Sequence, residues 1–282
     1  MARATRQKGY DENRRYPRRK RRGYRFHPVR FLFALGLIAA LVVIAALLVS
    51  YARSRRGYEE LRDAVLVTPT PATVTPLQPE QGTTPAPSPT PEIDFVVDWA
   101  KLKKTNRHIR AWLYCPDTNI SYPVVQYTDN EYYLTHNFER DEDDAGALFF
   151  DCETMFSNGF ENWVIYGHRR NDGSMFGSLV RFSEDDYRQA HPCMYLLMED
   201  ATYRVELFSC RTVHVYPEYF KLWFKDESSF LQYINKAINQ SYWSPGFSVT
   251  TQHPILTLST CSTYSHDEDP RLLVHGRLVP ID

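Results

Sequence analysis

Three residues whose side chains can carry out acyl transfer stand at the ends of apolar runs. Cys261 closes the run 254–261, and Arg271 follows ten positions later. His168 closes a second β-like run, 163–167, and lies 93 residues before Cys261. A thiolate attacks a carbonyl carbon, an imidazole transfers the proton, and a cation steadies substrate or oxyanion charge. These residue types therefore indicate a thiol acyl-transfer site.

Such a site needs the thiolate, because a neutral thiol with a pKa of about 8.5 is a poor nucleophile. A neighbouring imidazolium or guanidinium lowers the thiol pKa, so His168 and Arg271 could activate Cys261 without a third carboxylate. Each residue also has a structural interpretation. Free Cys is often buried, a lone His fits a satisfied core position, and Arg271 fits a surface charge beside the acids at 267–269.

Short β-rich runs, separated by Pro, Asn, Asp and Gly, are the elements that must position these residues. The runs are 111–114, 122–126, 147–150, 163–167, 194–198, 202–213, 255–259 and 272–279. Apolar residues at helical spacing predict a helix within 94–111 and helical insertions at 175–179 and 228–241. Eight such runs predict an all-β barrel or sandwich decorated with helices.

The chain before these runs is divided by charge. The first thirty residues hold twelve Lys or Arg and two acids, although the net charge of the whole chain is −1. Residues 31–49 carry no charge and span roughly 28 Å as a helix, close to the thickness of a bilayer core. We therefore predict a basic cytoplasmic tail at 1–30 and a transmembrane anchor at 31–51.

A cleavable signal peptide is the alternative, because residues 50–52 fit a small-x-small cleavage site. The apolar run is longer than the usual signal-peptide core, which favours an uncleaved anchor. Topology and anionic lipid headgroups explain the basic tail without nucleic-acid binding. We expect an extracellular catalytic domain attached to the membrane by this single N-terminal helix.

A juxtamembrane segment, 52–67, leads to a Pro/Thr-rich linker at 68–91, which has eight Pro and seven Thr in twenty-four positions. This composition favours extended polyproline II and predicts a semi-rigid spacer of about 75 Å that holds the head away from the bilayer. Its Thr residues could carry sugars. The head, 92–282, is long enough for one well-buried domain.

The remaining cysteines of the head show no zinc-type spacing. They are Cys115, Cys152, Cys193 and Cys210. With Cys261 the count is odd, so at least one thiol lacks an intramolecular partner, and we expect most of them to be buried thiols. The acidic run 141–144 resembles a calcium loop, but Cys152 stands where an EF-hand needs Glu. We therefore expect no metal site.

Several segments of the head, in their order and spacing, closely resemble class B sortases, the membrane-anchored cysteine transpeptidases of Gram-positive bacteria. The segments are ISYPVVQ (120–126), DNEYYL (129–134) with His136, YGH (166–168), GSMFGSL (173–179), HP (191–192), TLSTC (257–261) and RLLVH (271–275). TLSTC with a downstream Arg is typical of sortases in general. The N-terminal helix, YPVVQ, GSMFGSL and the helical insertion before the Cys strand are typical of class B.

The resemblance covers roughly 94–279 and implies an eight-stranded β-barrel with an N-terminal helix and a helical insertion before the strand of Cys261. It implies that Cys261 is the nucleophile, His168 the general acid and base, and Arg271 the substrate or oxyanion contact. It also implies cleavage of a C-terminal sorting signal after Thr, through a thioester. The acyl group then passes to an amine of peptidoglycan or its lipid-linked precursor, with no cofactor.

Five further residues are candidates for binding substrate. Ser259 and Thr260 belong to the TLSTC segment, and Thr260 would orient Arg271 or the substrate backbone. Tyr219, Trp223 and Tyr242 belong to an aromatic-rich part of the chain that would line a groove and exclude water from the thioester. Ordinary packing is the alternative for each aromatic residue and for Thr260.

Two departures from the family pattern concern the rim of the groove. Arg169 and Arg170 follow His168 where Asn is commoner, and Gly276–Arg277 stands where Ala-Lys is typical. Three other functions stay open beside cell-wall anchoring: polymerisation of pilins with a Lys acceptor, hydrolysis by a thiol peptidase, and surface binding by an inactive module. Intact Cys261, His168 and Arg271 count against the inactive module.

Overall fold

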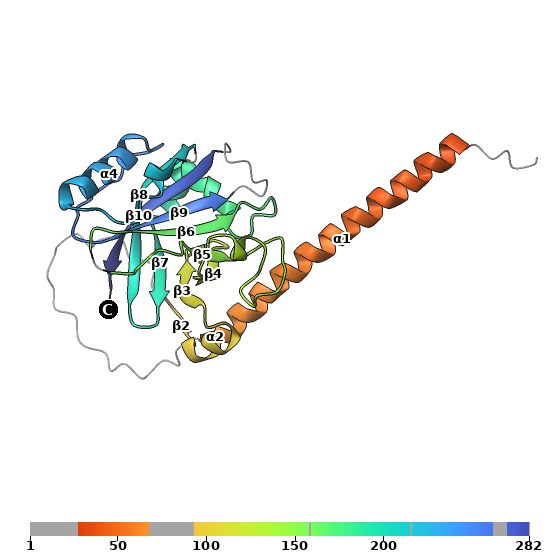
Figure 1. The fold of residues 1–282 in the computed structure, drawn as a ribbon, viewed down its shortest axis with the longest axis horizontal. Helices are drawn as coiled ribbons and strands as arrows, with labels where there is room; N and C mark the ends of the chain where they lie inside the picture. The colour runs from red at the N-terminus through yellow and green to blue at the C-terminus, as the bar shows by residue number, and fades with distance from the viewer. Residues whose placement is uncertain (1–27, 68–92, 158, 215, 262–269, 282) are drawn as a thin grey trace, which may run out of the picture. The chain divides into compact units, whose positions relative to one another are not determined.

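Eight strands close into a barrel in the order β10-β8-β7-β3-β4-β5-β6-β9 (Figure 1). The strands are β3 (Ile109–Tyr114), β4 (Ser121–Val125), β5 (Leu148–Phe150), β6 (Asn162–His168), β7 (Cys193–Met198), β8 (Thr202–Val213), β9 (Ile255–Cys261) and β10 (Arg271–Pro280). These are the eight runs expected from the sequence, each shifted by two residues or fewer at its start. The predicted eight-stranded barrel is confirmed.

This computed structural model describes residues 28–67, 93–157, 159–214, 216–261 and 270–281, with Cys261 described by its backbone. Most of the predicted basic tail and the predicted linker at 68–91 lie outside the described residues. The chain divides into two compact units, Met1–Leu47 and Leu48–Asp282. The barrel belongs to the second unit.

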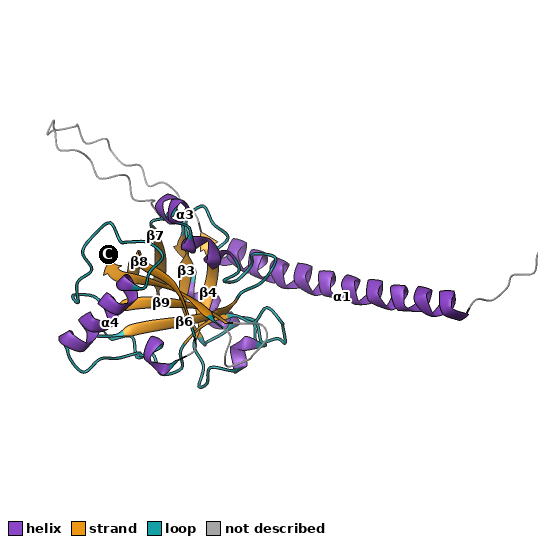
Figure 2. Cartoon of the chain, turned by 90° about the horizontal axis from the view of Figure 1, so that it is seen from above, coloured by secondary structure: helices purple, strands orange, loops and turns teal. Residues whose placement is uncertain are grey.

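Large apolar side chains fill the barrel, among them the fully buried Trp112 and Trp163. The outer face over β8 is covered by α4 (Glu227–Asn239), as Figures 1 and 2 show. Phe230 and Ile234 of α4 are buried in a cluster with Phe208 and other residues of this face. Their spacing of four residues places them on one face of the helix, which confirms the insertion predicted at 228–241.

Helices elsewhere are shorter than the sequence suggests. α2 (Trp99–Thr105) replaces the predicted 94–111, because the Asp98 carboxylate accepts a hydrogen bond from the Lys101 N–H at 2.9 Å and caps the helix there. The short helical insertion expected to open within 175–179 begins at Ser178 as a 3-10 helix, η2 (Ser178–Ser183), and is followed by α3 (Asp185–Ala190). Two other 3-10 turns are η1 (Tyr132–Leu134) and η3 (Pro217–Tyr219).

The N-terminal helix α1 (Pro28–Val65) is the one described helix that is long and apolar enough to cross a membrane. Its last part, from Leu48, belongs to the same unit as the barrel. Tyr58, Leu61 and Val65 are buried in the main core cluster of that unit. The segment predicted as a juxtamembrane connection therefore contributes to the folded head.

Two short strands bracket the predicted linker. β1 (Leu66–Val67) pairs antiparallel with β2 (Val96–Val97), so Val67 lies opposite Val96. The Asp98 N–H also donates to the Val65 carbonyl at 2.8 Å. Because the chain on either side of 68–91 is paired, the expected spacer does not separate residues 48–67 from the barrel.

Candidate active site

The register of two parallel strands brings His168 and Cys261 together. β6 and β9 are neighbours in the barrel, and His168 is the Cα partner of Cys261. β10 lies antiparallel on the other side of β9 and pairs Leu273 with Ser259. The paired part of this ladder ends there, and β10 itself begins two residues earlier, at Arg271. Extending the same register by two residues sets the Arg271 backbone opposite Cys261. Since side chains alternate along a strand, the backbone places these three residues in one row on one face of the sheet.

A single carbonyl orients the His168 ring. Nε2 of His168 lies 2.6 Å from the carbonyl oxygen of Leu134, at the end of η1. A carbonyl only accepts hydrogen bonds, so Nε2 carries the hydrogen and donates it. In the neutral ring, Nδ1 is then the free acceptor. Nδ1 is buried and has no hydrogen-bond partner among the described residues, so it is the nitrogen available as a base.

The surroundings of His168 favour the neutral ring. Burial lowers the pKa of His168 below its ordinary value, and the bond to Leu134 opposes this effect. The Arg170 and Arg271 guanidinium groups lower the pKa further, because a neighbouring cation disfavours the imidazolium. A neutral His168 is ready to accept a proton at neutral pH.

Thr260 holds the start of β10. Its hydroxyl accepts a hydrogen bond from the Leu272 N–H at 3.0 Å, and its carbonyl accepts one from Nη1 of Arg271 at 3.4 Å. The Arg271 contact is thus made by the Thr260 backbone carbonyl, whereas the Thr260 hydroxyl binds the backbone of Leu272. Orientation of Arg271, contact with the substrate backbone and ordinary packing all remain predictions for the Thr260 side chain. Nε of Arg271 is buried with no partner within the described part of the chain.

Ser259 lies on the same face of β9 as Cys261, one side-chain step away. The residue is 1% exposed, and its hydroxyl has no hydrogen-bond partner among the residues that the structure describes. A buried hydroxyl ordinarily has a partner. Ser259 thus offers a polar group directly beside the row of His168, Cys261 and Arg271.

The three aromatic candidates lie in different places. The Tyr242 hydroxyl donates to Thr212 at 2.7 Å, and Thr212 pairs with Leu272, so Tyr242 lies close to the start of β10. Trp223 forms a bridge with Glu161, seven residues before His168. At about 3.3 Å per residue this is ~23 Å along the strand. The structure does not bring Trp223 to the row of His168 and Cys261.

Tyr219 lies at an intermediate position. Its ring packs against the cationic ends of Arg211 and Lys236, at 5.0 and 4.6 Å. The next residue, Phe220, has its ring 6.1 Å from that of Tyr166, which precedes His168 by two residues on β6. The segment that carries Tyr219 therefore borders the face on which His168 lies.

Sequence reasoning missed the support behind His168. Gly146 has a positive φ of 59°, and a Cβ there would lie 2.9 Å from the Leu134 carbonyl oxygen and 3.2 Å from Cδ2 of His168. The Gly146 carbonyl accepts a hydrogen bond from the Tyr58 hydroxyl of α1 at 2.7 Å. Leu134 belongs to the DNEYYL segment, and that segment was the one feature of the sequence that could have indicated this support for His168.

The other four cysteines are free thiols in the structure. Cys115, Cys193 and Cys210 are buried, as expected, whereas Cys152 is half-buried. Burial raises the pKa of Cys115 and of Cys210 to about 12, and it also raises the pKa of Cys152 and Cys193. These four thiols are therefore protonated at neutral pH. The described residues contain no group of three or more His, Cys, Asp or Glu arranged to hold a metal ion.

Comparisons with known proteins agree with this architecture. A sortase domain model matches residues 113–279. Sortase B of Listeria monocytogenes is 34% identical over 178 residues, which are 63% of this chain and 72% of the relative. Sortase B of Staphylococcus aureus is 26% identical over 180 residues, 64% of this chain and 74% of the relative.

Solved structures show the same fold. The structure of sortase B from B. anthracis in complex with AAEK1 is 27% identical with a TM-score of 0.67, and the match covers 83% of this chain and 100% of that chain. An S. aureus sortase B–substrate complex is 25% identical with a TM-score of 0.63, covering 65% and 85%.

The barrel and the domain match define the class: the chain belongs to the sortase family of cysteine transpeptidases. Within that family, the relatives and the solved structures place it in class B. Sortases act in general on surface proteins that carry a sorting signal and on amine acceptors of the cell wall, so this enzyme anchors surface proteins.

Proposed function

We propose that Cys261, His168 and Arg271 are the catalytic residues of this transpeptidase. The observation that carries the proposal is the register between β6 and β9, which makes His168 and Cys261 Cα partners on adjacent parallel strands. The free Nδ1 of His168 and the position of Arg271 at the start of β10 support it.

The reaction begins when the Cys261 sulfur attacks the Thr carbonyl carbon of the sorting signal and His168 Nδ1 accepts the thiol proton. Arg271 stabilises the oxyanion of the tetrahedral intermediate. The C–N bond breaks, and the leaving amine takes its proton from His168, which leaves a thioester on Cys261. An acceptor amine attacks this thioester and gives its proton to His168. A new amide forms, and the Cys261 sulfur leaves and is protonated by His168.

The substrates proposed for this site are a C-terminal sorting signal, cleaved after Thr, and an amine of peptidoglycan or its lipid-linked precursor. A solved complex of S. aureus sortase B with a substrate, and one of a sortase B with triglycine, support a peptide donor and an amine acceptor for this class. The unpartnered hydroxyl of Ser259 and the ring of Tyr242 flank the row of catalytic residues and are the proposed donor contacts. Tyr219 borders the same face.

The proposed location follows from α1. The helix is apolar enough to span a membrane, and the basic residues that precede it keep the N-terminus in the cytoplasm. The barrel then lies on the extracellular side, where sorting signals and cell-wall amines are found.

The test is product analysis by chromatography. The unit 48–282 is incubated with peptides of the NPxTx and xPxTG types, with glycine, diaminopimelate or a Lys peptide as the amine. We expect an amine-capped product that Cys261→Ala does not form. Cleavage with no capture of any amine indicates a peptidase instead, and capture of the Lys peptide alone indicates pilin polymerisation.

A further inference from the structure

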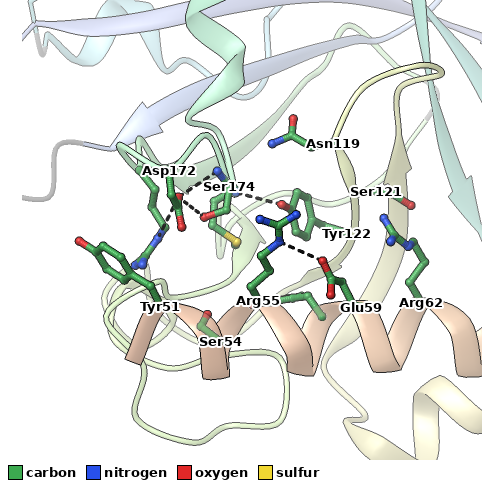
Figure 3. Close-up of a pocket in the computed structure, with 13 residues that line it drawn as sticks. Tyr51, Ser54, Arg55, Glu59, Arg62, Asn119, Ser121, Tyr122, Asp172 and Ser174 are labelled. Carbon is green, nitrogen blue, oxygen red and sulfur yellow. Dashed lines mark hydrogen bonds and ion pairs between the residues drawn. The ribbon is translucent and has the colours of Figure 1, made fainter. Parts of the chain in front are cut away.

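A cavity of about 180 Å³ lies within the unit Leu48–Asp282, between the last part of α1 and loops beside the barrel (Figure 3). Tyr51, Arg55 and Arg62 of α1 line one side. Asn119 and Arg170 line the other. At about 30 Å³ for each water in the liquid, the cavity has room for roughly six water-sized groups, which is enough for a phosphate group with part of its ester.

The charges around the cavity favour an anion. Arg55 is paired with Glu59 at 2.9 Å, and Arg170 lies 3.7 Å from Asp172. Arg62 makes no ion pair with a described residue, so the lining carries one formal positive charge in excess. The Arg170 guanidinium is held 4.2 Å from the centre of the Tyr51 ring. Guanidinium groups are suited to phosphate because their planar donors match two phosphate oxygens.

Neutral polar groups complete the lining. Ser54 of α1 and Ser121, at the start of β4, face the cavity with Asn119 and Ser174. The Ser174 hydroxyl donates to Asp172, and one amide hydrogen of Asn119 goes to the Gly173 carbonyl. Ser54, Ser121 and the second amide hydrogen of Asn119 are therefore the neutral donors that the described residues leave for a ligand. A phosphate oxygen accepts hydrogen bonds from hydroxyl and amide groups as well as from guanidinium. Figure 3 shows Arg55 and Arg62 reaching from α1 toward the side chains of Asn119 and Ser121.

The cavity begins where the apolar part of α1 stops. Tyr51 follows Val49, the last residue of the apolar run, by two positions. At 1.5 Å per residue, Tyr51 and Arg55 lie about 3 and 9 Å beyond the run along the helix. The headgroup layer of a bilayer is roughly 5–8 Å thick on each side. Arg55 therefore lies at or just outside the headgroups when 31–49 spans the hydrocarbon core. The backbone of Arg62 lies about 20 Å beyond the run, so only its long side chain, on a helix whose side chains tilt toward the N-terminus, reaches back toward the headgroups.

We propose that this cavity binds the phosphate of an anionic phospholipid headgroup from the outer leaflet, with Arg55 and Arg62 as its principal contacts. The inference rests on the proposal that α1 anchors the chain with the barrel outside. A bound headgroup would link α1 to the loop of Arg170, two residues beyond His168, and so tie the catalytic unit to the lipid surface.

The test uses the full chain in nanodiscs of phosphatidylcholine, with and without phosphatidylglycerol, and reads the unfolding temperature of the catalytic unit. The cavity variant is Arg55→Gln with Arg62→Gln. The matched control is Arg53→Gln with Arg56→Gln, which removes the same charge from the same helix at positions outside the cavity lining. A third arm adds inorganic phosphate to phosphatidylcholine discs.

We expect phosphatidylglycerol to raise Tm by about 4 °C in the wild type and the control, and to leave the cavity variant unchanged. Equal rises in all three proteins would overturn the proposal in favour of diffuse attraction to the surface. A rise with inorganic phosphate alone would overturn the lipid source. Equal Tm in every lipid would exclude binding.

Two readouts in the same discs separate this inference from the proposed function. Transpeptidation by the wild type reports on Cys261, His168 and Arg271, and its absence leaves the Tm comparison intact. Carbonate extraction reports on the anchor: release of the chain from the lipid contradicts the membrane location and, with it, the lipid source of the phosphate.

Discussion

The protonation state of His168 is set by the groups that surround its ring. The Leu134 carbonyl fixes the hydrogen on Nε2, and burial with two nearby guanidinium groups lowers the pKa. Of these groups, only Arg170 is close to His168 in the sequence, whereas Leu134 and Arg271 are brought to it by the fold. Arg170, the second of the two arginines that follow His168, thus acts on the base.

Arg170→Gln should shift the pH profile of catalysis. Removing the cation favours the imidazolium, so the pKa of His168 rises and the acidic limb of kcat/KM moves to higher pH. Arg169→Gln is the matched control, because Arg169 is exposed and adjacent. The measurement is kcat/KM from pH 4.5 to 8. Identical acidic limbs for the two variants would contradict the assigned influence of Arg170.

His275 should make the fold sensitive to acid. It is fully buried, both ring nitrogens lack partners among the described residues, and burial together with Arg211 lowers its pKa well below the usual value. Below about pH 6.5 the unfolded chain binds a proton that the folded chain does not. The free energy of unfolding therefore falls as pH drops, by up to ~1.4 kcal/mol per pH unit for this residue.

Replacing His275 checks that account. In His275→Leu the slope of unfolding free energy against pH, measured by urea titration between pH 6.5 and 5, should be smaller than in the wild type. An unchanged slope would assign the acid sensitivity to other groups, and His168 and His108 are two further histidines with a lowered pKa.

Among the elements, the end of α1 is the one whose role the sequence did not reveal. Tyr58 contacts Gly146 across 88 positions of sequence, and Gly146 in turn packs on the Leu134 carbonyl and the His168 ring. The apolar spacing in α1 indicates a helix but does not name its partner. The helix predicted within 94–111 is too long for a related reason: Val96 fits helical spacing, yet it pairs with β1.

Tyr58→Phe should weaken both the fold and the site. It leaves the buried Gly146 carbonyl without its donor, which costs about 1–3 kcal/mol, and it loosens the support behind His168. We expect a lower Tm and a lower kcat with little change in KM. Tyr51→Phe is the control, since Tyr51 makes a ring contact that Phe preserves. Equal effects of the two substitutions would remove the special role of Tyr58.

For the whole molecule, the barrel was predictable and the surroundings of its site only in part. Strand-forming runs and the TLSTC segment locate β6, β9 and β10, and parallel pairing of β6 with β9 then makes His168 and Cys261 partners. Aromatic content cannot say which end of a barrel a residue occupies. The sequence therefore did not predict that Trp223 lies near Glu161 whereas Tyr242 lies near Arg271.

The pairing of β1 with β2 predicts that residues 68–91 are dispensable for the fold. Replacing them with a short Gly/Asn turn should leave Tm and kcat/KM close to the wild-type values, because the chain on both sides is already paired. In contrast, a head that starts at Glu92 lacks the buried Tyr58, Leu61 and Val65. At about 1.5–3 kcal/mol for each buried apolar side chain, we expect it to be strongly destabilised. Equal thermal stability of the 92–282 and 48–282 proteins would contradict the contribution of α1.

The central claim is that Cys261 carries the acyl group and that an amine removes it. Intact mass spectrometry of the 48–282 unit, mixed with an accepted sorting peptide and followed by peptide mapping, tests this most directly. The account predicts a mass increase equal to the acyl fragment that maps to Cys261, disappears when an amine is added, and is absent in Cys261→Ala. An adduct on Cys115, Cys152, Cys193 or Cys210, or turnover by Cys261→Ala near the wild-type rate, would contradict it.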